Sequence, residues 1–341
     1  MTMKKKPCVP ARFLPGDRPM PEPGVEIVRS NLSEHAAAVA WSHLGQGGSE
    51  PTEIILLSKR VKSSIYRLVG ATLERSSVVA KYCQRHTARH ERIIYEEILP
   101  KLPVTTPQFY GFVAGESDFD WLFLEDVQGE RYSRENESHS ILAARWLGLL
   151  HTSAAYLANS KVLPNRGPEY FVEQLKVAHQ SLSHSLSTLH LTPADFAVFV
   201  TVVSQCAFLE SHWNQIERWC ERMPRTLVHG DFKPKNAVIR RGSRGVTFLP
   251  FDWEASGWGV PAADLAFVDI PVYHSTVQDI WRALNFQDLL RMAVVGKIFR
   301  GIAEFNWESQ KFDPRWEFST VKLRFYQDRM TEAIGMAGWE A

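Results

Sequence analysis

The spacing of apolar and polar residues along the chain predicts strands in its first part and helices in the remainder. Short apolar runs bounded by turn residues predict strands at 53–57, 64–69, 77–82, 108–113 and 121–127. Apolar residues at helical spacing predict helices at 33–44, 88–99, 138–157, 168–189, 193–222, 286–307 and 314–335. Ser33 is the expected N-cap of the first helix. With 341 residues, the chain suits two lobes rather than one small core.

This pattern divides the chain into three segments. Residues 1–30 contain six prolines between Pro7 and Pro23, a density that prevents a regular helix. We therefore expect an extended or disordered arm at the surface. Residues 31–129 contain the first group of predicted strands and should form a sheet-bearing lobe. Residues 130–341 contain most of the predicted helices and should form a second, mainly helical lobe.

Composition and charge exclude several classes of protein. Lysine and arginine total 39 against 38 acidic residues, so the chain shows no basic footprint for nucleic acid or for an anionic membrane. No apolar run approaches the length of a membrane span, and no apolar segment follows the basic Met1–Lys6 as in a signal peptide. The four cysteines are scattered, at positions 8, 83, 206 and 220, which predicts free thiols and a cytoplasmic location.

The candidate chemistry lies in the stretch 227–239, which has the pattern of a strand, a polar loop and a second strand. The loop holds Asp231, Lys233 and Asn236, and the next apolar run ends at Asp252. Two acids and an amide on adjacent loops can orient a hydroxyl and bind Mg²⁺, which is most of what phosphoryl transfer requires of a protein. The alternative is an ordinary turn, where Asp and Asn are common for conformational reasons.

The sequence H-G-D-x-x-x-x-N from His229 to Asn236, followed by D-W-E, resembles the kinase-like phosphotransferases of the aminoglycoside phosphotransferase and choline kinase superfamily. This resemblance implies a bilobal protein-kinase-like α+β fold, with a small antiparallel-sheet lobe that binds the nucleotide and a larger helical lobe. It also implies ATP and Mg²⁺ as cofactors. Asp231 would accept the proton of the acceptor hydroxyl, and Lys233 would contact the transferred phosphate. Asn236 and Asp252 would hold Mg²⁺, while His229 is expected to pack beneath the loop.

Two further stretches are similar to the nucleotide-binding elements of the same superfamily. Val78-Val79-Ala80-Lys81 resembles the V-A-I-K strand, whose lysine grips the nucleotide phosphates. Glu91 is its expected partner by the resemblance, with Glu96 and Glu97 as rivals. The run 121–127 resembles the hinge, which implies that adenine bonds to the Glu125 carbonyl and the Val127 N–H.

The loop at 58–63 departs from the family pattern because it contains no glycine, although relatives carry glycine where the backbone covers the phosphates. The pair Ser63-Ser64 is similar to the small polar residue that the family places near this loop tip. One interpretation is a phosphate cover built from hydroxyl and cationic donors. The other is a solvated basic turn on a hairpin.

The acceptor class follows from what surrounds the loop 229–236, which we call the catalytic loop. Residues 152–228, read as helices, separate the helix 138–157 from His229, and no long activation segment follows Asp252. Instead the chain continues to G-x-P-x-x-D-L-A, in which the resemblance gives Asp264 a structural role; His151 is likewise expected to be a packed core histidine. These features favour a small-molecule acceptor over a protein substrate.

The sequence therefore predicts an ATP-dependent phosphotransferase that acts on a hydroxyl of a small molecule, such as an aminoglycoside, an amino alcohol or a sugar. The aromatic residues of the C-terminal helices are either core or a cage for a quaternary ammonium. Acidic residues there form no cluster of the kind a polycation requires. A catalytically silent nucleotide-binding protein and a protein kinase are the alternatives, and the sequence assigns no oligomeric state.

Overall fold

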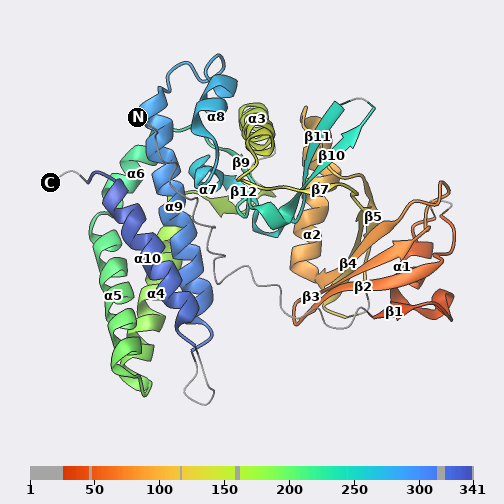
Figure 1. Cartoon of the computed structure of the whole chain (residues 1–341), viewed down its shortest axis with the longest axis horizontal. Coiled ribbons are helices and arrows are strands. Elements are labelled where there is room, and N and C mark those ends of the chain that lie inside the picture. The colour runs from red at the N-terminus through yellow and green to blue at the C-terminus, as the bar shows by residue number, and fades with distance from the viewer. Residues whose placement is uncertain are drawn as a thin grey trace, which may run out of the picture.

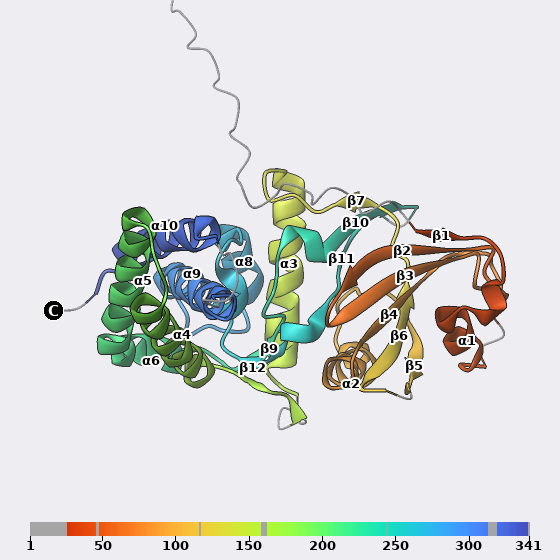
Figure 2. The same ribbon diagram turned by 90° about the horizontal axis from the view of Figure 1, so that it is seen from below.

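A six-stranded antiparallel sheet forms the first lobe (Figures 1 and 2). The computed structural model describes residues 26–45, 48–115, 117–157, 162–243, 245–312 and 319–339. In spatial order the strands are β1 (Ile27–Val28), β2 (Glu53–Arg60), β3 (Ser63–Val69), β4 (Val78–Gln84), β6 (Phe119–Glu125) and β5 (Phe109–Val113). All five strands predicted for this lobe are present. Of the proline-rich arm, residues 1–25 lie outside the described residues, and Ile27–Val28 pair with β2 at the sheet edge.

Side-chain alternation along β4 gives the sheet two different faces. Val78 and Ala80 are buried in the same cluster as α1 (Ala36–Ser42). Lys81 and Cys83 point to the opposite face, where Cys83 packs with Ala88 of α2 (Arg85–Ile93). Helix α2 continues as a π-helical turn, Ile94–Ile98, and a 3-10 turn, Leu99–Lys101.

The prediction that Ser33 caps the first helix is wrong. Ser33 lies inside a 3-10 turn, Leu32–Glu34, and α1 begins only at Ala36. His35 is the N-cap instead, and its Nδ1 accepts a hydrogen bond of 3.2 Å from the Ala37 N–H. An imidazole nitrogen has therefore taken the place that a hydroxyl usually occupies at a helix start.

The second lobe is mainly helical, with two three-stranded sheets beside the catalytic loop. Its helices are α3 (Glu137–Ala154), α4 (Pro168–Thr188), α5 (Pro193–Ser211), α6 (Trp213–Glu221), α7 (Ala262–Leu265), α8 (Ile270–Val277), α9 (Phe286–Ser309) and α10 (Val321–Met336). One sheet joins β7 (Glu130–Arg131), β10 (Ala237–Gly242) and β11 (Gly245–Pro250). The other joins β8 (Asn165–Arg166), β12 (Gly257–Gly259) and β9 (Thr226–Val228).

The single helix predicted over 193–222 is two helices, because the backbone leaves helical geometry at His212. The His212 Nδ1 lies 2.8 Å from the carbonyl oxygen of Phe208, at the end of the first helix. After this break α6 contacts α9, whereas α5 contacts α10. The last predicted helix begins at Val321 rather than at 314, and residues 313–318 lie outside the described part of the chain.

Helix α9 is the centre of the helical lobe, with α4, α5, α6, α8 and α10 around it in Figure 2. Its Phe299 is 1% exposed and stacks on Phe171 of α4, with ring centroids 3.9 Å apart. The same helix carries Arg300 and Glu304, so the packing of this core also fixes the position of charged groups near the catalytic loop.

Among the described residues, α5 is the one helix whose length and composition would allow it to cross a membrane. The sequence analysis expected no such segment. In the structure α5 packs against α4 and α10, and Gln205 donates to Thr331 of α10 at 2.8 Å. Cys83, Cys206 and Cys220 are buried free thiols, as predicted; Cys8 lies outside the described residues.

Replacing Phe299 with alanine should lower the free energy of unfolding by about 3–5 kcal/mol, because the change removes a stacked ring and leaves a cavity. Leu290→Ala on the same helix is the matched control. The Leu290 side chain is 37% exposed, so this substitution should lower the free energy of unfolding by no more than about 1 kcal/mol. Urea unfolding followed by circular dichroism measures both, and equal losses would contradict this account of the core.

Candidate active site

The catalytic loop joins β9 to β10 and ends in the 3-10 turn Pro234–Asn236. Ala237 pairs with Pro250 at the start of the β10–β11 hairpin, so Asn236 and Asp252 leave the hairpin at the same end. The Phe251 N–H donates to the Asn236 carbonyl oxygen at 2.9 Å and ties the two segments together. The sheet register therefore brings two residues predicted as metal ligands to one place.

A buried carboxylate holds the start of this loop. The Asp264 oxygens accept the N–H groups of His229 at 2.7 Å and Gly230 at 2.8 Å, and one lies 3.2 Å from His151 Nε2. Gly230 has φ of 75°, and a Cβ there would lie 2.3 Å from the Ala255 carbonyl oxygen. Glycine is thus required by both the backbone conformation and the close approach. His151 and His229 are fully buried, as the sequence analysis expected.

Asp231 lies between two cations from different parts of the chain. Its Oδ2 is 2.5 Å from Lys233 Nζ and its Oδ1 is 2.6 Å from Arg300 Nη1. The Asn236 Nδ2 donates to Oδ2 at 3.0 Å. Burial opposes the charged form of Asp231, but Lys233 and Arg300 outweigh it and lower the pKa below its ordinary value. The carboxylate is therefore ionised at neutral pH.

The predicted partner of Lys81 is present: its Nζ lies 2.5 Å from Glu91 Oε1. The rival Glu96 pairs with Arg92 instead, and Glu97 is exposed. The same Nζ is 2.8 Å from Asp252 Oδ1, a contact that joins the sheet lobe to the end of β11. Burial opposes the charge on Lys81, but these two carboxylates outweigh it and raise its pKa well above the ordinary value.

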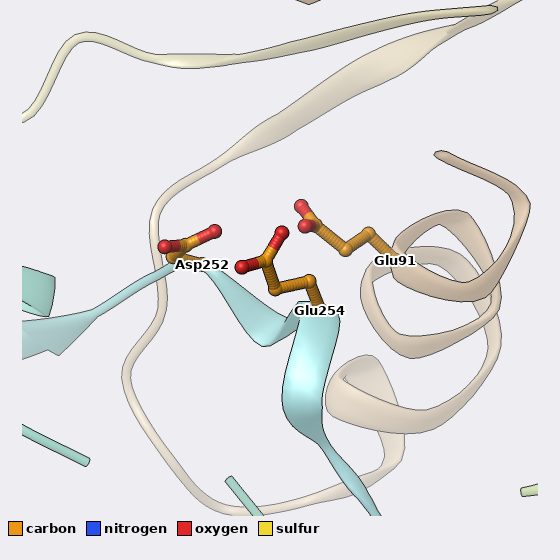
Figure 3. Close-up of side chains that lie close together, drawn as sticks. All are labelled: Glu91, Asp252 and Glu254. Atoms are coloured by element: carbon orange, nitrogen blue, oxygen red, sulfur yellow. The ribbon is translucent and has the colours of Figure 1, made fainter. Parts of the chain in front are cut away.

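Three carboxylates converge beside this lysine (Figure 3). Oxygen atoms of Glu91, Asp252 and Glu254 lie within 4.8 Å of one another, and Glu91 Oε2 is buried without a hydrogen-bond partner among the described residues. Oxygen donors of this kind are the ligands that Mg²⁺ prefers. Asn236 and Asp252 were predicted for this purpose, whereas Glu254 was not, although its place two residues after Asp252 was a usable signal.

A comparison with protein families decides the class of this chain. The family described as the phosphotransferase enzyme family, APH, matches residues 56–307. The chain belongs to this family. The family predicted from the catalytic-loop motif is thereby confirmed, and a search among curated proteins finds no match.

Solved structures with the same fold come from several phosphotransferases. The macrolide 2′-phosphotransferase of Brachybacterium faecium is 12% identical, with a TM-score of 0.55 over 89% of this chain and 98% of that one. An ethanolamine kinase of Plasmodium vivax is 15% identical, with a TM-score of 0.55 over 81% and 80%. A streptomycin–ATP complex of APH(2″)-IIa is 16% identical, with a TM-score of 0.54 over 89% and 97%. The predicted bilobal, kinase-like α+β fold is confirmed.

The phosphotransferase places Ser63 and Ser64 on opposite faces of its sheet. Ser63 lies two residues from Ile65, which pairs directly with Lys81, so these three share one face. Ser64 pairs with Tyr82 and points to the other face. The loop tip is the two-residue turn between Arg60 and Ser63. A phosphate contact from the Ser63 hydroxyl is thus consistent with the position of Lys81, whereas the Ser64 hydroxyl points away.

The predicted hinge follows β6 directly. Glu125 ends the strand, and its side chain pairs with Arg240 of β10. The next residue, Asp126, donates its N–H to the Ser77 carbonyl oxygen at 3.3 Å and pairs with Arg67 at 2.7 Å. The backbone that leads to Val127 is therefore held at both sides, and its contact with adenine stays a prediction.

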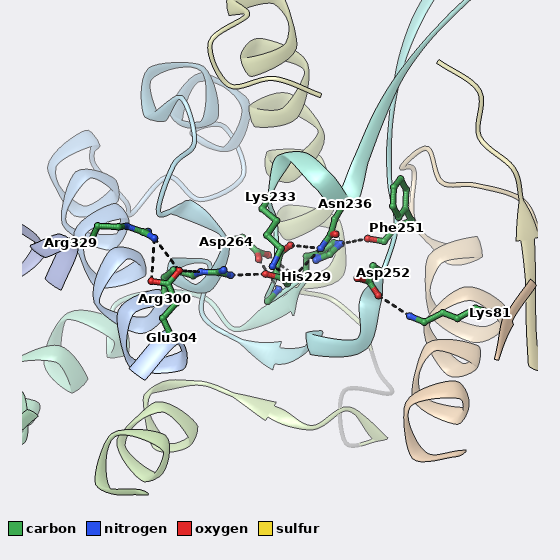
Figure 4. A network of polar contacts seen from close by, with 12 residues as sticks. Lys81, His229, Lys233, Asn236, Phe251, Asp252, Asp264, Arg300, Glu304 and Arg329 are labelled. Atoms are coloured by element: carbon green, nitrogen blue, oxygen red, sulfur yellow. Dashed lines mark hydrogen bonds and ion pairs between the residues drawn. The ribbon is translucent and has the colours of Figure 1, made fainter. Parts of the chain in front are cut away.

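The charged residues of α9 and α10 that reach the catalytic loop were not among the site residues predicted from the sequence. Arg300 Nε donates to Glu304 at 2.8 Å, and Arg329 Nη1 donates to the same carboxylate at 3.0 Å, which extends the network from Asp231 across two helices (Figure 4). No local spacing links these residues to the catalytic loop. Of the candidate cage aromatics, Phe299 and Phe305 are core, and the Trp307 ring lies 5.3 Å from the Arg300 guanidinium.

Removing the Asp264 carboxylate should destabilise the catalytic loop. Asp264→Ala leaves two buried N–H donors without an acceptor, at a cost of about 1–3 kcal/mol each, while Asp264→Asn keeps one acceptor oxygen and should lose less. Thermal melting and amide hydrogen exchange at Gly230 measure the effect. The exposed Asp279→Ala is the control, and unchanged exchange in Asp264→Ala would refute the anchoring role.

Proposed function

We propose that this phosphotransferase moves the γ-phosphate of ATP to a hydroxyl of a small molecule, with Asp231 as the base. The observation that carries the proposal is the convergence of Asp231, Lys233 and Asn236 with the pair Lys81–Asp252 in one polar network. Each of these side chains has a separate task in phosphoryl transfer, which consists mostly of positioning and charge neutralisation.

The nucleotide would bind between the sheet lobe, residues 31–129, and the catalytic loop. Lys81, held by Glu91, is aimed at Asp252 and is available to neutralise the nucleotide phosphates. Ser63 shares its sheet face, and the backbone of Glu125 and Val127 would receive adenine. Structures of related fold were solved with ATP, GDP and ADP, which supports a purine nucleotide as the donor.

The donor set beside Lys81 fits a divalent cation. Asn236 and Asp252 would hold Mg²⁺, and the Glu254 carboxylate is close enough to Asp252 to take part. The ion, when bound, neutralises charge on the phosphates. Lys81 now occupies one oxygen of Asp252, so this side chain would divide its two oxygens between the lysine and the metal.

Asp231 would accept the proton of the acceptor hydroxyl, and Lys233 would contact the phosphate as it moves. Both oxygens of Asp231 already accept hydrogen bonds from this chain. Oδ2 accepts two of these bonds and Oδ1 only the one from Arg300, so an incoming hydroxyl would bind at Oδ1, beside or in place of that donor. Arg300 is the one that comes from outside the catalytic loop, and its side chain is 22% exposed.

A small-molecule acceptor agrees with the arrangement of the helical lobe. Helices α4, α5 and α6 lie between α3 and β9, and a short path through β12 and α7 joins Asp252 to Asp264. In a protein kinase, the segment that takes the place of this path is long and binds the peptide substrate. The buried free thiols are consistent with a cytoplasmic location, which we retain as part of the proposal.

Asp231→Asn should reduce phosphate transfer by roughly 10²–10⁴-fold while leaving MgATP binding intact, because it removes the base but no nucleotide contact. The measurement is transfer from γ-labelled MgATP to a panel of aminoglycosides, macrolides, amino alcohols, sugars and hydroxy acids. The MgATP-induced rise in melting temperature is the control for binding. Binding with no transfer to any acceptor would favour a silent nucleotide-binding protein, and labelling of a generic protein would favour a protein kinase.

Transfer should decline as the pH rises through about 8. The pKa of Lys233 is lowered to about 8, mainly by burial and also by the charges of Arg300 and Lys235, while Asp231 opposes them. Above that pH the lysine is neutral and no longer stabilises charge on the phosphate. The pH profile of kcat/KM between about pH 6 and 10 measures this. Lys233→Arg keeps the charge and should remove the alkaline decline; an unchanged profile in this variant would refute the assignment.

A further inference from the structure

Three arginines are linked to one another beside Asp231, and one of them, Arg300, contacts it directly. Arg134 precedes α3, Arg300 lies on α9 and Arg329 lies on α10; we call them the arginine cluster. Arg134 and Arg329 lie over the same ring, with guanidinium carbons 4.3 and 5.0 Å from the Phe267 centroid. Arg300 and Arg329 share the Glu304 carboxylate. The cluster thus joins three separate elements next to the proposed base.

The cluster has more positive than negative charge. Together with Lys233 it holds four cations, and the carboxylates in contact with them are Asp231 and Glu304. The next acidic residue on α9, Glu308, forms an ion pair with Lys311 at 2.7 Å. Arg134 has no carboxylate within ion-pair distance in the part of the chain that the structure describes. Burial lowers the pKa of Arg134, and the charges of Arg300 and Arg329 lower it further, although Tyr132 opposes them.

An excess of partly buried cations is unfavourable unless an anion compensates it. The guanidinium group binds carboxylate and phosphate in bidentate geometry, which makes an arginine cluster suited to such a group. Arg300 and Arg329 keep 22% and 27% of their side-chain surface exposed, so they remain reachable from solvent. A polycation such as an aminoglycoside would meet like charges at this place.

We propose that the acceptor is an anionic hydroxy compound, whose carboxylate or phosphate is bound by the arginine cluster while its hydroxyl lies at Asp231. This inference rests on the proposed function and names the class of substrate. The anion would draw the Arg300 Nη1 from Asp231 Oδ1, only 2.6 Å away, and free that oxygen for the hydroxyl. Binding of the acceptor would thereby make Asp231 Oδ1 more accessible to its hydroxyl.

The transfer itself is balanced without a further reactant. The acceptor oxygen forms a bond to the γ-phosphorus, and the bond from that phosphorus to the bridging oxygen of ATP breaks. ADP leaves with the electron pair, and the hydroxyl proton passes to Asp231.

The test uses acceptors that share a carbon skeleton and differ in charge. One series is glycerate, glycerol phosphate, glycerol and 3-aminopropane-1,2-diol; another is gluconate, glucose 6-phosphate, glucose and glucosamine. Labelling from γ-labelled MgATP, and the rise in melting temperature with a non-hydrolysable ATP analogue, are measured for each compound. We expect the carboxylate or phosphate member to exceed its neutral and cationic counterparts, and the two anionic arms separate a hydroxy acid from a phosphate ester.

Arg134→Gln should raise KM for the preferred anionic acceptor by about tenfold or more, with kcat nearly unchanged, because it removes a binding contact that does not touch the reacting atoms. Arg134→Lys should give a KM between those of wild type and Arg134→Gln. Arg145 is an exposed arginine of α3, and Arg145→Gln should have the KM of wild type. A preference for neutral or cationic acceptors, or no response to any anionic compound, overturns the inference. So does an unaltered KM in Arg134→Gln. The MgATP-induced rise in melting temperature reports separately on the proposed function.

Discussion

The buried carboxylate of Asp264 is the constraint on which the active site depends. A charge removed from water must be compensated by hydrogen-bond donors, and here the donors are two successive backbone N–H groups of the catalytic loop. His151 of α3 also contacts this carboxylate and is itself bonded to Tyr273 of α8. The helical lobe and the loop are thus joined through one side chain, and the position of Asp231 follows from that of Gly230.

On either side of this loop, acidic and basic side chains follow one another in ion pairs. Asp231 is balanced by Lys233 and Arg300, and the chain of contacts continues through Glu304 to Arg329. On the other side, Lys81 balances Glu91 and Asp252. Buried ion pairs of this kind contribute little to stability compared with apolar packing of the same volume. Their presence in a lobe otherwise built on aromatic and aliphatic packing is better explained by binding of charged reactants.

The two sides of the network differ in what they can receive. The carboxylates near Lys81 form a site for a cation, whereas the groups around Arg300 form a site with excess positive charge. A nucleotide with its metal suits the first site, and an anionic acceptor suits the second. Under the proposed function, the protein would distinguish its two substrates by charge, with Asp231 between the two sites.

The sequence by itself determined the elements that depend on neighbours close along the chain. The catalytic loop and the position of Asp252 follow from strand ends and short spacings, where local backbone geometry dictates where a side chain points. The pairing of Lys81 with Glu91 was predicted from the family resemblance instead, with Glu96 and Glu97 as rivals. Ser63 and Ser64 show the limit of such reasoning: neighbours in a strand face opposite ways, but only the pairing of β3 with β4 shows that Ser63 is the one on the Lys81 face. The break at His212 was equally hidden, since both flanking segments are good helices.

Only the tertiary structure brought Arg134, Arg300 and Arg329 together. Arg300 lies 69 residues after Asp231. From the sequence, an arginine at this position of a helix is expected to face solvent, and its spacing does not indicate contact with a carboxylate so far along the chain. Its position results from the packing of α9 against α4 and α10, which turns one face of the helix toward the catalytic loop. Local pattern therefore predicted the chemistry of phosphate transfer, whereas the surroundings of the acceptor were decided by contacts between helices that are far apart in the chain.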